Sequence, residues 1–188
     1  EYLAERVIAS GFPGRVAAGH CCALSALDEA AAARVVARVA QAGIHVISLP
    51  SCNMFLMGRK DRGLIRRGLT RVHELLAAGV HVSIASDNIR DAFNPYGDGD
   101  MLQELLIAGH ALHMGAPAEL ERLMHMATYA PARLMGLPCY GLEAGDEASF
   151  VVLDAPELGQ ALAECAPRPY VFSRGRLVAR TTVVREWL

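Results

Sequence analysis

The sequence predicts an α/β fold in which parallel strands alternate with helices and are followed by a small β-rich module. Short β-branched runs and helical patterns alternate up to residue 138, which is typical of a parallel sheet. From residue 141 the pattern changes to strands separated by a turn. The 188 residues are 53% hydrophobic and 20% charged, as expected for a packed globular protein.

The first strand–helix unit follows a charged N-terminal segment, residues 1–6, which has a helical composition. A short buried strand is predicted at 15–19 and a helix at 28–43. Asp28 lies in the first turn of this helix, where the helix dipole favours carboxylates. Gly43 is expected to end the helix, because glycine adopts the left-handed backbone of a C-terminal cap without strain.

Two further strand–helix units repeat this pattern. A second strand is expected at 44–49, closed by Pro50, and a long loop at 51–69. A loop of this length in a compact α/β unit is more often functional than accidental. Thr70 is expected to cap the next helix, and the third strand is expected at 80–85.

The remaining elements are predicted from the same periodicities. A polar loop at 89–100 leads to helical stretches at 101–114 and 117–137. Strands are then expected at 148–154 and 170–179, the second of them containing a turn.

We place a domain boundary at residue 138. Residues 1–138 hold the parallel strand–helix units, and residues 139–188 hold the β-rich module. Three such units do not close a barrel of eight, and the first strand presents an edge that proteins normally cover. The chain is therefore expected to be a piece of a larger domain or to pair with another copy of itself.

Composition and charge exclude several classes of protein. The formal net charge of −2 gives no electrostatic case for binding nucleic acid or an anionic membrane. No apolar run is long enough to span a bilayer, for which about 20 residues are needed. The five cysteines are an odd number in a chain large enough for a core, which indicates free thiols and a cytoplasmic location. Cys21 and Cys22 follow His20 directly, but structural zinc sites space their cysteines further apart.

Two polar side chains follow predicted strands where a parallel sheet places its chemistry. His20 ends the first strand and Asp87 the third, and the carboxyl ends of parallel strands meet at one edge. Imidazole and carboxylate suit both proton transfer and divalent metals such as zinc or iron. The simpler interpretations are a hydrogen-bonded histidine at a loop start and an Asx-turn at 86–88. We expect the two side chains to lie close together.

These residues occur within a series of segments that resembles the cytosine-deaminase branch of the amidohydrolase superfamily. The resemblance covers nearly the whole chain, and it rests on the order of the segments more than on any one of them. The matching segments are 19–20, 53–62, 66–72, 78–80, 86–91, 94–97, 128–137 and 141–154.

The resemblance implies a partial (β/α)8 barrel, made of its last three strand–helix units, followed by the C-terminal part of a small β-domain. It implies that His20 contacts the hydrolytic water and the substrate. It implies that Asp87 binds one divalent metal, zinc or iron, and accepts a proton from the attacking water. The implied reaction is hydrolysis of an exocyclic C–N bond on a small heterocycle, a pyrimidine- or triazine-like ring.

The sequence departs from the family pattern in two ways. The His-x-His and His-x-x-Glu segments have no match here, so this chain alone is expected to be inactive and to bind no metal tightly. Either an N-terminal half is missing or the chain forms a homo-oligomer. Asn88 stands where the cytosine enzymes usually have an acidic residue, and Phe93 where they tend to have tryptophan. Both are candidate substrate-binding residues, and they leave open which ring is accepted.

Two other classes of function compete with this hypothesis. The chain could be a non-catalytic α/β association module in which His20 and Asp87 are relics. The basic loop at 59–67 could bind phosphorylated ligands, although a solvated loop with one or two structural arginines is the simpler interpretation because the whole chain is not basic.

Overall fold

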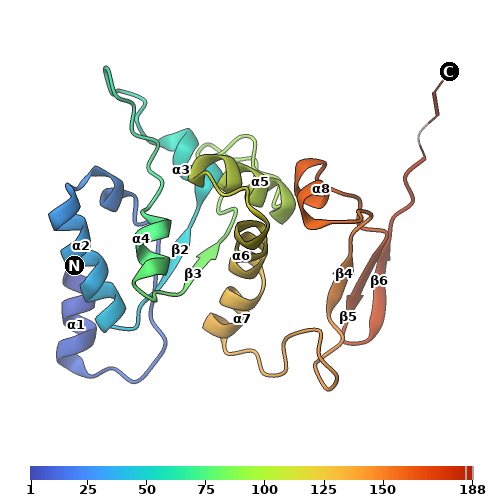
Figure 1. The fold of residues 1–188 in the computed structure, drawn as a ribbon, viewed down its shortest axis with the longest axis horizontal. Coiled ribbons are helices and arrows are strands. Elements are labelled where there is room, and N and C mark those ends of the chain that lie inside the picture. Colours follow the sequence, from blue (N-terminus) through green and yellow to red (C-terminus); the bar gives the residue numbers. More distant parts are fainter. Residues whose placement is uncertain (185, 188) are drawn as a thin grey trace.

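The computed structural model describes residues 1–184, 186 and 187. Its first sheet is parallel, with strand order β1 (Ala17–Gly19), β2 (His45–Ser48) and β3 (Val82–Ile84). Figure 1 shows this sheet between helices, with the second sheet beyond them at the other end of the molecule. The predicted order of three parallel strands is confirmed, and each strand is shorter than the range predicted for it.

Helices precede, separate and cover these strands as the periodicity predicts. The N-terminal helix α1 (Tyr2–Ser10) packs beside α2 (Glu29–Gln41), and a short 3-10 helix, η1 (Cys22–Ala26), lies between β1 and α2. Asp28 caps α2, because its carboxylate accepts the Ala31 backbone N–H at 2.8 Å.

The expected loop at 51–69 is wrong in its first part. Residues Pro50–Leu56 form helix α3, which begins immediately after β2. Pro50 starts this helix instead of closing the strand, because proline's fixed φ and missing N–H suit the first helical position. Thr70 does not cap the next helix, α4 (Val72–Ala77), whose N-cap is Arg71. The Thr70 hydroxyl is instead buried without a hydrogen-bond partner among the described residues.

The two faces of the parallel sheet differ in chemistry. One face carries apolar side chains, such as Val46 and Val82 (each 1% exposed), and packs into the core formed with α2, α4 and α6. The opposite face follows from the pairing register, since side chains alternate along each strand. That face carries mainly small and polar residues: Ala17, Gly19, His45, Ile47 and Ser83.

Three helices complete the first part of the chain. They are α5 (Met101–Leu112), α6 (Pro117–Ala127) and α7 (Tyr129–Met135). The sequence predicts one helical stretch at 117–137, but the helix breaks at Thr128, whose φ and ψ of −124° and −79° are not helical.

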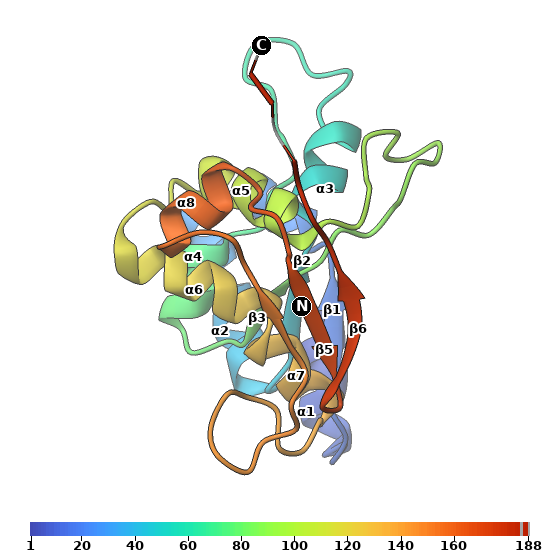
Figure 2. The ribbon, with the colours of Figure 1, turned by 90° about the vertical axis from the view of Figure 1, so that its right-hand side faces the viewer.

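The second sheet is antiparallel, with order β4 (Phe150–Val152), β5 (Tyr170–Ser173) and β6 (Arg176–Arg180). A short helix that the periodicity does not predict, α8 (Leu158–Ala163), lies between β4 and β5 and packs on α5 and α6. Figure 2 shows β5 and β6 from their exposed side. No residue of these three strands is fully buried.

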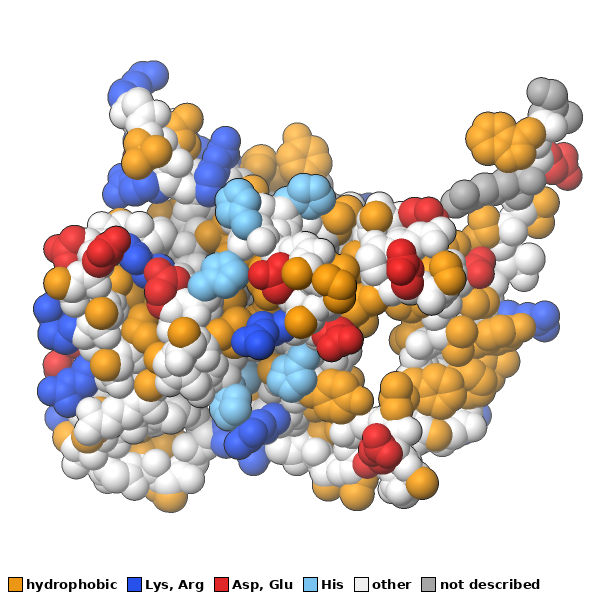
Figure 3. Space-filling view, viewed as in Figure 1, with side chains coloured by type: hydrophobic (Ala, Val, Ile, Leu, Met, Phe, Trp, Pro, Cys, Tyr) orange, Lys and Arg blue, Asp and Glu red, His pale blue; other side chains and the backbone are white. Residues whose placement is uncertain are grey.

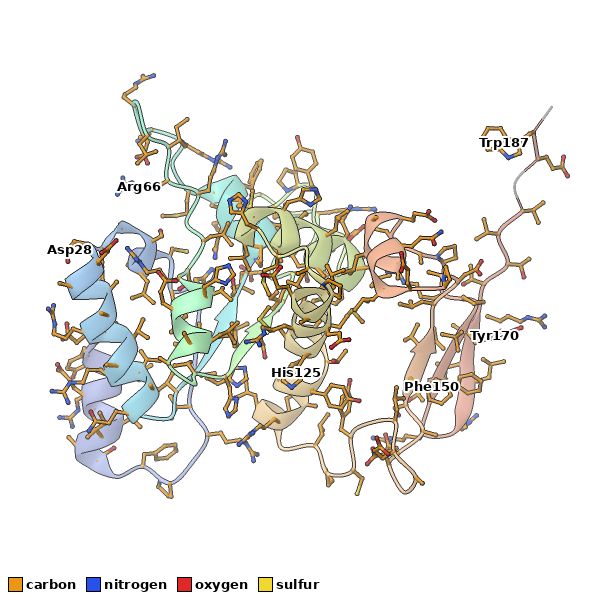
Figure 4. The ribbon with its side chains drawn as sticks, viewed as in Figure 1. Asp28, Arg66, His125, Phe150, Tyr170 and Trp187 are labelled. Carbon is orange, nitrogen blue, oxygen red and sulfur yellow. The ribbon has the colours of Figure 1, made fainter. Side chains whose placement is uncertain are left out.

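A cavity of about 920 Å³ separates the second sheet from α6 and α7. Figure 3 shows it as a hollow rimmed by hydrophobic side chains. Phe150 lines it and stacks on Phe172 with 4.7 Å between ring centroids. Figure 4 shows Phe150 on the side of the sheet that faces the helices and Trp187 far out on the C-terminal segment, where it is 94% exposed. Among the described residues, no helix has the length and apolar character needed to cross a membrane.

Candidate active site

The carboxyl ends of all three parallel strands contribute polar side chains to one edge of the sheet. β1 leads into His20, β2 leads into Cys52 and Asn53 at the start of α3, and β3 leads into Asp87 and Asn88. This edge is where parallel α/β folds place their chemistry, because loops there can converge on a ligand without disturbing the sheet.

His20 and Asp87 both adopt a left-handed backbone, with φ of 63° and 64°. Few residues other than glycine do so, and such positions cluster at functional sites. The His20 backbone N–H still donates to the Ile47 carbonyl oxygen at 3.0 Å. The chain therefore turns sharply at the strand end and directs the imidazole over the edge of the sheet.

The predicted proximity of His20 and Asp87 is confirmed. The His20 Nε2 atom lies 3.7 Å from Asp87 Oδ2, although β2 separates the two strands. The side chains are 50% and 30% exposed. An imidazole and a carboxylate thus share a solvent-accessible space, where they can exchange a proton with a bound water or substrate.

Asn53, in the first turns of α3, contacts the His20 ring, and the sequence analysis does not identify it as a site residue. The Asn53 Oδ1 atom lies 2.9 Å from His20 Nδ1, and Asn53 is only 2% exposed. The strand-end rule that selects His20 and Asp87 applies equally to β2. The sequence instead predicts that Pro50 closes β2 and that residues 51–69 form a loop, which places Asn53 away from the strand end.

Cys52, the residue before Asn53, contacts Asn88 on the β3 side of the site. Its thiol donates to Asn88 Oδ1 at 3.2 Å, and the side chain is fully buried. Burial, and then the neighbouring Asp87 carboxylate, raise the pKa of Cys52 to about 11. The thiol therefore stays protonated at neutral pH and remains a hydrogen-bond donor.

The loop from Asn88 to Gly97 is held against α3 and α5. The Asn88 amide donates to Asp91 at 2.5 Å, and the buried Asn94 side chain donates to Ser51 Oγ at 3.2 Å. The Ser51 backbone N–H in turn donates to the Glu104 carboxylate of α5 at 2.8 Å. The loop and the first turn of α3 thus form one connected hydrogen-bond network.

The two candidate substrate-binding residues differ in placement. Asn88 lies beside Asp87, with its amide oriented by Cys52 and Asp91. Phe93 is 58% exposed, and its backbone N–H donates to Asp91 at 2.9 Å. The structure therefore brings His20, Asp87 and Asn88 together and leaves the Phe93 ring on the surface of the loop.

The basic loop has structural arginines, in agreement with the simpler interpretation of its charge. The Arg66 guanidinium makes a two-pronged contact with Asp61, at 2.9 and 3.0 Å. Arg59 lies 4.5 Å over the Phe55 ring, and Arg67 donates to the Met54 carbonyl oxygen at 3.3 Å. Three of its basic residues thus make contacts within the chain.

The donors at this edge fit a divalent metal in kind but not in number. Imidazole and carboxylate are ordinary ligands of zinc and iron, but a catalytic zinc has three protein ligands. Within the described residues, no group of three or more His, Cys, Asp or Glu side chains is placed to hold a metal ion. These residues do not form a metal site by themselves.

The sequence and the α/β architecture match a known class of hydrolases. The sequence pattern of the Amidohydrolase family covers residues 1–184, and the chain belongs to that family.

Three relatives place the chain more closely. It is 38% identical to a pterin deaminase from Rhizobium rhizogenes over 181 residues, which are 95% of this chain and 41% of that protein. It is 31% identical to an N-isopropylammelide isopropyl amidohydrolase from a Pseudomonas species, over 97% of this chain and 42% of that protein. The structure superposes on a 5-methylcytosine deaminase from Klebsiella pneumoniae with a TM-score of 0.90 and 33% identity, over 99% of this chain and 45% of that one. The chain thus spans less than half the length of these relatives.

Proposed function

We propose that this chain is the C-terminal part of a metal-dependent deaminase that hydrolyses an exocyclic C–N bond on a small heterocycle. The observation that carries the proposal is the 3.7 Å approach of His20 Nε2 to Asp87 Oδ2 at the carboxyl edge of the parallel sheet. The proposal is supported by the family assignment and by relatives named for the deamination of a pterin and of 5-methylcytosine.

In the proposed reaction, Asp87 moves the proton and His20 orients the reactants. A carboxylate that is 30% exposed can accept a proton from an attacking water and deliver it to the departing nitrogen. The His20 imidazole can hydrogen-bond the same water or the oxygen that forms on the ring. The left-handed backbone at both residues sets the direction in which each side chain leaves the main chain.

The complete protein requires parts that this chain does not contain. We infer that residues 1–138 form the last three strand–helix units of a (β/α)8 barrel and residues 139–188 part of a small β-domain. We further infer one divalent metal, zinc or iron, in the complete protein, with Asp87 as one ligand and the others from outside this chain. A second copy of the chain is the alternative source of the missing surface. A cytoplasmic location stays a prediction, with which the five free cysteines agree.

The substrate we propose is a ring with amino and oxo substituents, such as a pyrimidine, pterin or triazine. Asn88 remains the candidate that reads the ring edge, because its amide has an acceptor and a donor. Its Oδ1 and one N–H are already engaged by Cys52 and Asp91. The remaining lone pair and N–H are therefore what it can offer a substrate. Phe93 stays a candidate only if its loop closes over bound substrate.

The test uses the complete protein and its Asp87→Asn variant, with kcat/KM measured on a panel of aminopyrimidines, pterins and triazines. Loss of the proton carrier is expected to lower kcat/KM for every accepted ring by roughly 10³- to 10⁴-fold. Asparagine keeps the side-chain shape and tolerates left-handed backbone, so the variant is expected to fold. Near-full activity of Asp87→Asn would overturn the proposed function.

A further inference from the structure

We propose that Asn53 is a positioning residue that fixes which ring nitrogen of His20 carries the proton. The Asn53 Oδ1 atom, 2.9 Å from His20 Nδ1, is a carbonyl oxygen and can only accept a hydrogen bond. With the amide oxygen facing the ring, Nδ1 is the donor, and in the neutral ring Nε2 is left with a lone pair. Nε2 lies 3.7 Å from Asp87 Oδ2.

The acceptor is held by a rigid support. Asn53 is 2% exposed and lies in the first turns of α3, directly after β2. The preceding two residues anchor the same turn, because Ser51 donates to Glu104 and Cys52 donates to Asn88. The position of the Asn53 oxygen is thus set by contacts with α5 and with the loop after β3.

Within the part of the chain that the structure describes, the Asn53 amide makes a hydrogen bond through its oxygen only. Its Nδ2 atom is buried and has no hydrogen-bond partner among the described residues. A buried polar group without a partner destabilises the folded state, whereas an apolar side chain of similar size does not carry that cost. The contact that the Asn53 amide makes within the described residues is therefore the one from its oxygen to His20.

The catalytic meaning of this tautomer rests on the proposed function. With Nδ1 protonated, His20 Nε2 and the Asp87 carboxylate are two acceptors that face a common space. A group with N–H or O–H bonds, such as the attacking water or a ring amino substituent, can donate to both. The opposite tautomer would direct an N–H at the carboxylate, and the two side chains would pair with each other instead of binding the reactants.

The tautomer can be read directly by NMR of the complete protein. Long-range ¹H–¹⁵N spectra of the imidazoles, recorded at alkaline pH where the rings are neutral, distinguish a protonated Nδ1 from a protonated Nε2. The wild-type protein is expected to show His20 protonated on Nδ1. Asn53→Leu is expected to shift the population toward protonated Nε2, the form that the histidine side chain prefers in water. Asn53→Asp, which keeps an acceptor oxygen at this position, is expected to retain the wild-type signature.

Asn94 provides a matched control, because it is equally buried at 2% exposure but bonds Ser51 and the Tyr96 backbone instead of His20. Asn94→Leu is expected to lower the unfolding midpoint more than Asn53→Leu does, since only Asn94 loses a bonded amide nitrogen. It should leave the His20 signature unchanged. Protonated Nε2 in the wild-type protein, or an unchanged signature in Asn53→Leu, would overturn the assignment of Asn53.

Kinetics of the complete protein then test the catalytic meaning separately. Removing a partner that orients an active-site histidine is expected to lower kcat by roughly 10- to 100-fold, with part of the loss restored in Asn53→Asp. The spectra need no substrate, so they stand even if the protein proves not to be a deaminase. A shifted tautomer with unchanged kcat would show that His20 orientation does not matter for turnover.

Discussion

The two sheets of this chain are stabilised in different ways. The parallel sheet is packed into a core that draws on α1, α2, α4, α5, α6 and α8, and all three residues of β3 are buried. The antiparallel sheet has no fully buried strand residue, and every residue of β6 is exposed. Within this chain, β2 and β3 of the first sheet are therefore held mainly by burial of their side chains, whereas β1, which has no fully buried residue, and the second sheet rely more on strand pairing.

The candidate site lies on the more deeply packed part of the chain. Its side chains stand on the packed sheet and on α3, which is bonded to α5 through Ser51 and Glu104. The second sheet contributes no residue to the site. It connects to the first part partly through an ion pair between Arg168 and Asp100, the N-cap residue of α5.

The largest expected difference between the two sheets is the loss of folding stability when a leucine in each region is replaced by alanine. Leu75 of α4 is 0% exposed, whereas Leu177 of β6 is 50% exposed. Leu75→Ala should lower the free energy of unfolding by ~2–5 kcal/mol, because it leaves a cavity in the core. Leu177→Ala should change it by about 0.5 kcal/mol or less. Urea unfolding of both variants measures the difference, and equal losses would mean that β6 is packed in solution.

A pH-dependent effect of similar size is expected from His45, at the start of β2. Its Nε2 lies 2.6 Å from Ser83 Oγ, and it is 5% exposed. Burial, and then His81 and Arg133, lower the pKa of His45 from 6.5 to about 4. The folded state thus resists protonation that the unfolded chain accepts. Stability is full above pH 6.5 and falls as the pH drops toward 4, by about 3 kcal/mol in total.

His45→Gln keeps a polar group near Ser83 but cannot be protonated. The free energy of unfolding of this variant should therefore change much less between pH 6.5 and 4 than that of the wild type. The remaining change is attributed to His81, because burial also lowers the pKa of His81. His110→Gln, on the exposed surface of α5, is the control. If the free energy of unfolding of the His45 variant depends on pH as in the wild type, groups other than His45 cause that dependence.

A smaller effect is expected at Gly97, which closes the loop that carries Asn88. A Cβ atom at this position would lie 2.0 Å from the Asn88 backbone oxygen. Gly97→Ala must therefore shift the backbone beside Asp87, at a cost of about 1–3 kcal/mol in stability. At Gly115 an added Cβ meets nothing within 4 Å, so Gly115→Ala should be close to neutral. Thermal unfolding of the two variants measures the difference. Equal losses of stability in Gly97→Ala and Gly115→Ala would contradict the prediction.

Periodicity predicted most of the fold, and its errors have local causes. The strands and α2 were found because β-branched runs and spaced apolar residues encode burial directly. The helix α3 was missed because Pro50 was interpreted as a strand terminator, although proline also starts helices. The six-residue helix α8 is too short for a periodic signal.

The site was predictable to the extent that it depends on strand ends. His20 and Asp87 follow their strands directly, so topology alone brings them together. The bonds from Asn53 to His20 and from Cys52 to Asn88 join residues 33 and 36 positions apart. They depend on where α3 begins, which the sequence pattern did not locate. The exposure of Phe93 likewise depends on the fold of a loop without a periodic signal.

The left-handed backbone at His20 and Asp87 limits which residues can replace them during evolution. A replacement must satisfy the chemistry of the position and also accept a conformation that β-branched side chains resist. Glycine, asparagine and aspartate accept it at the least cost. Substitutions at these two positions are therefore expected to favour these residues, which keep the shape of the strand ends whatever chemistry the side chains perform.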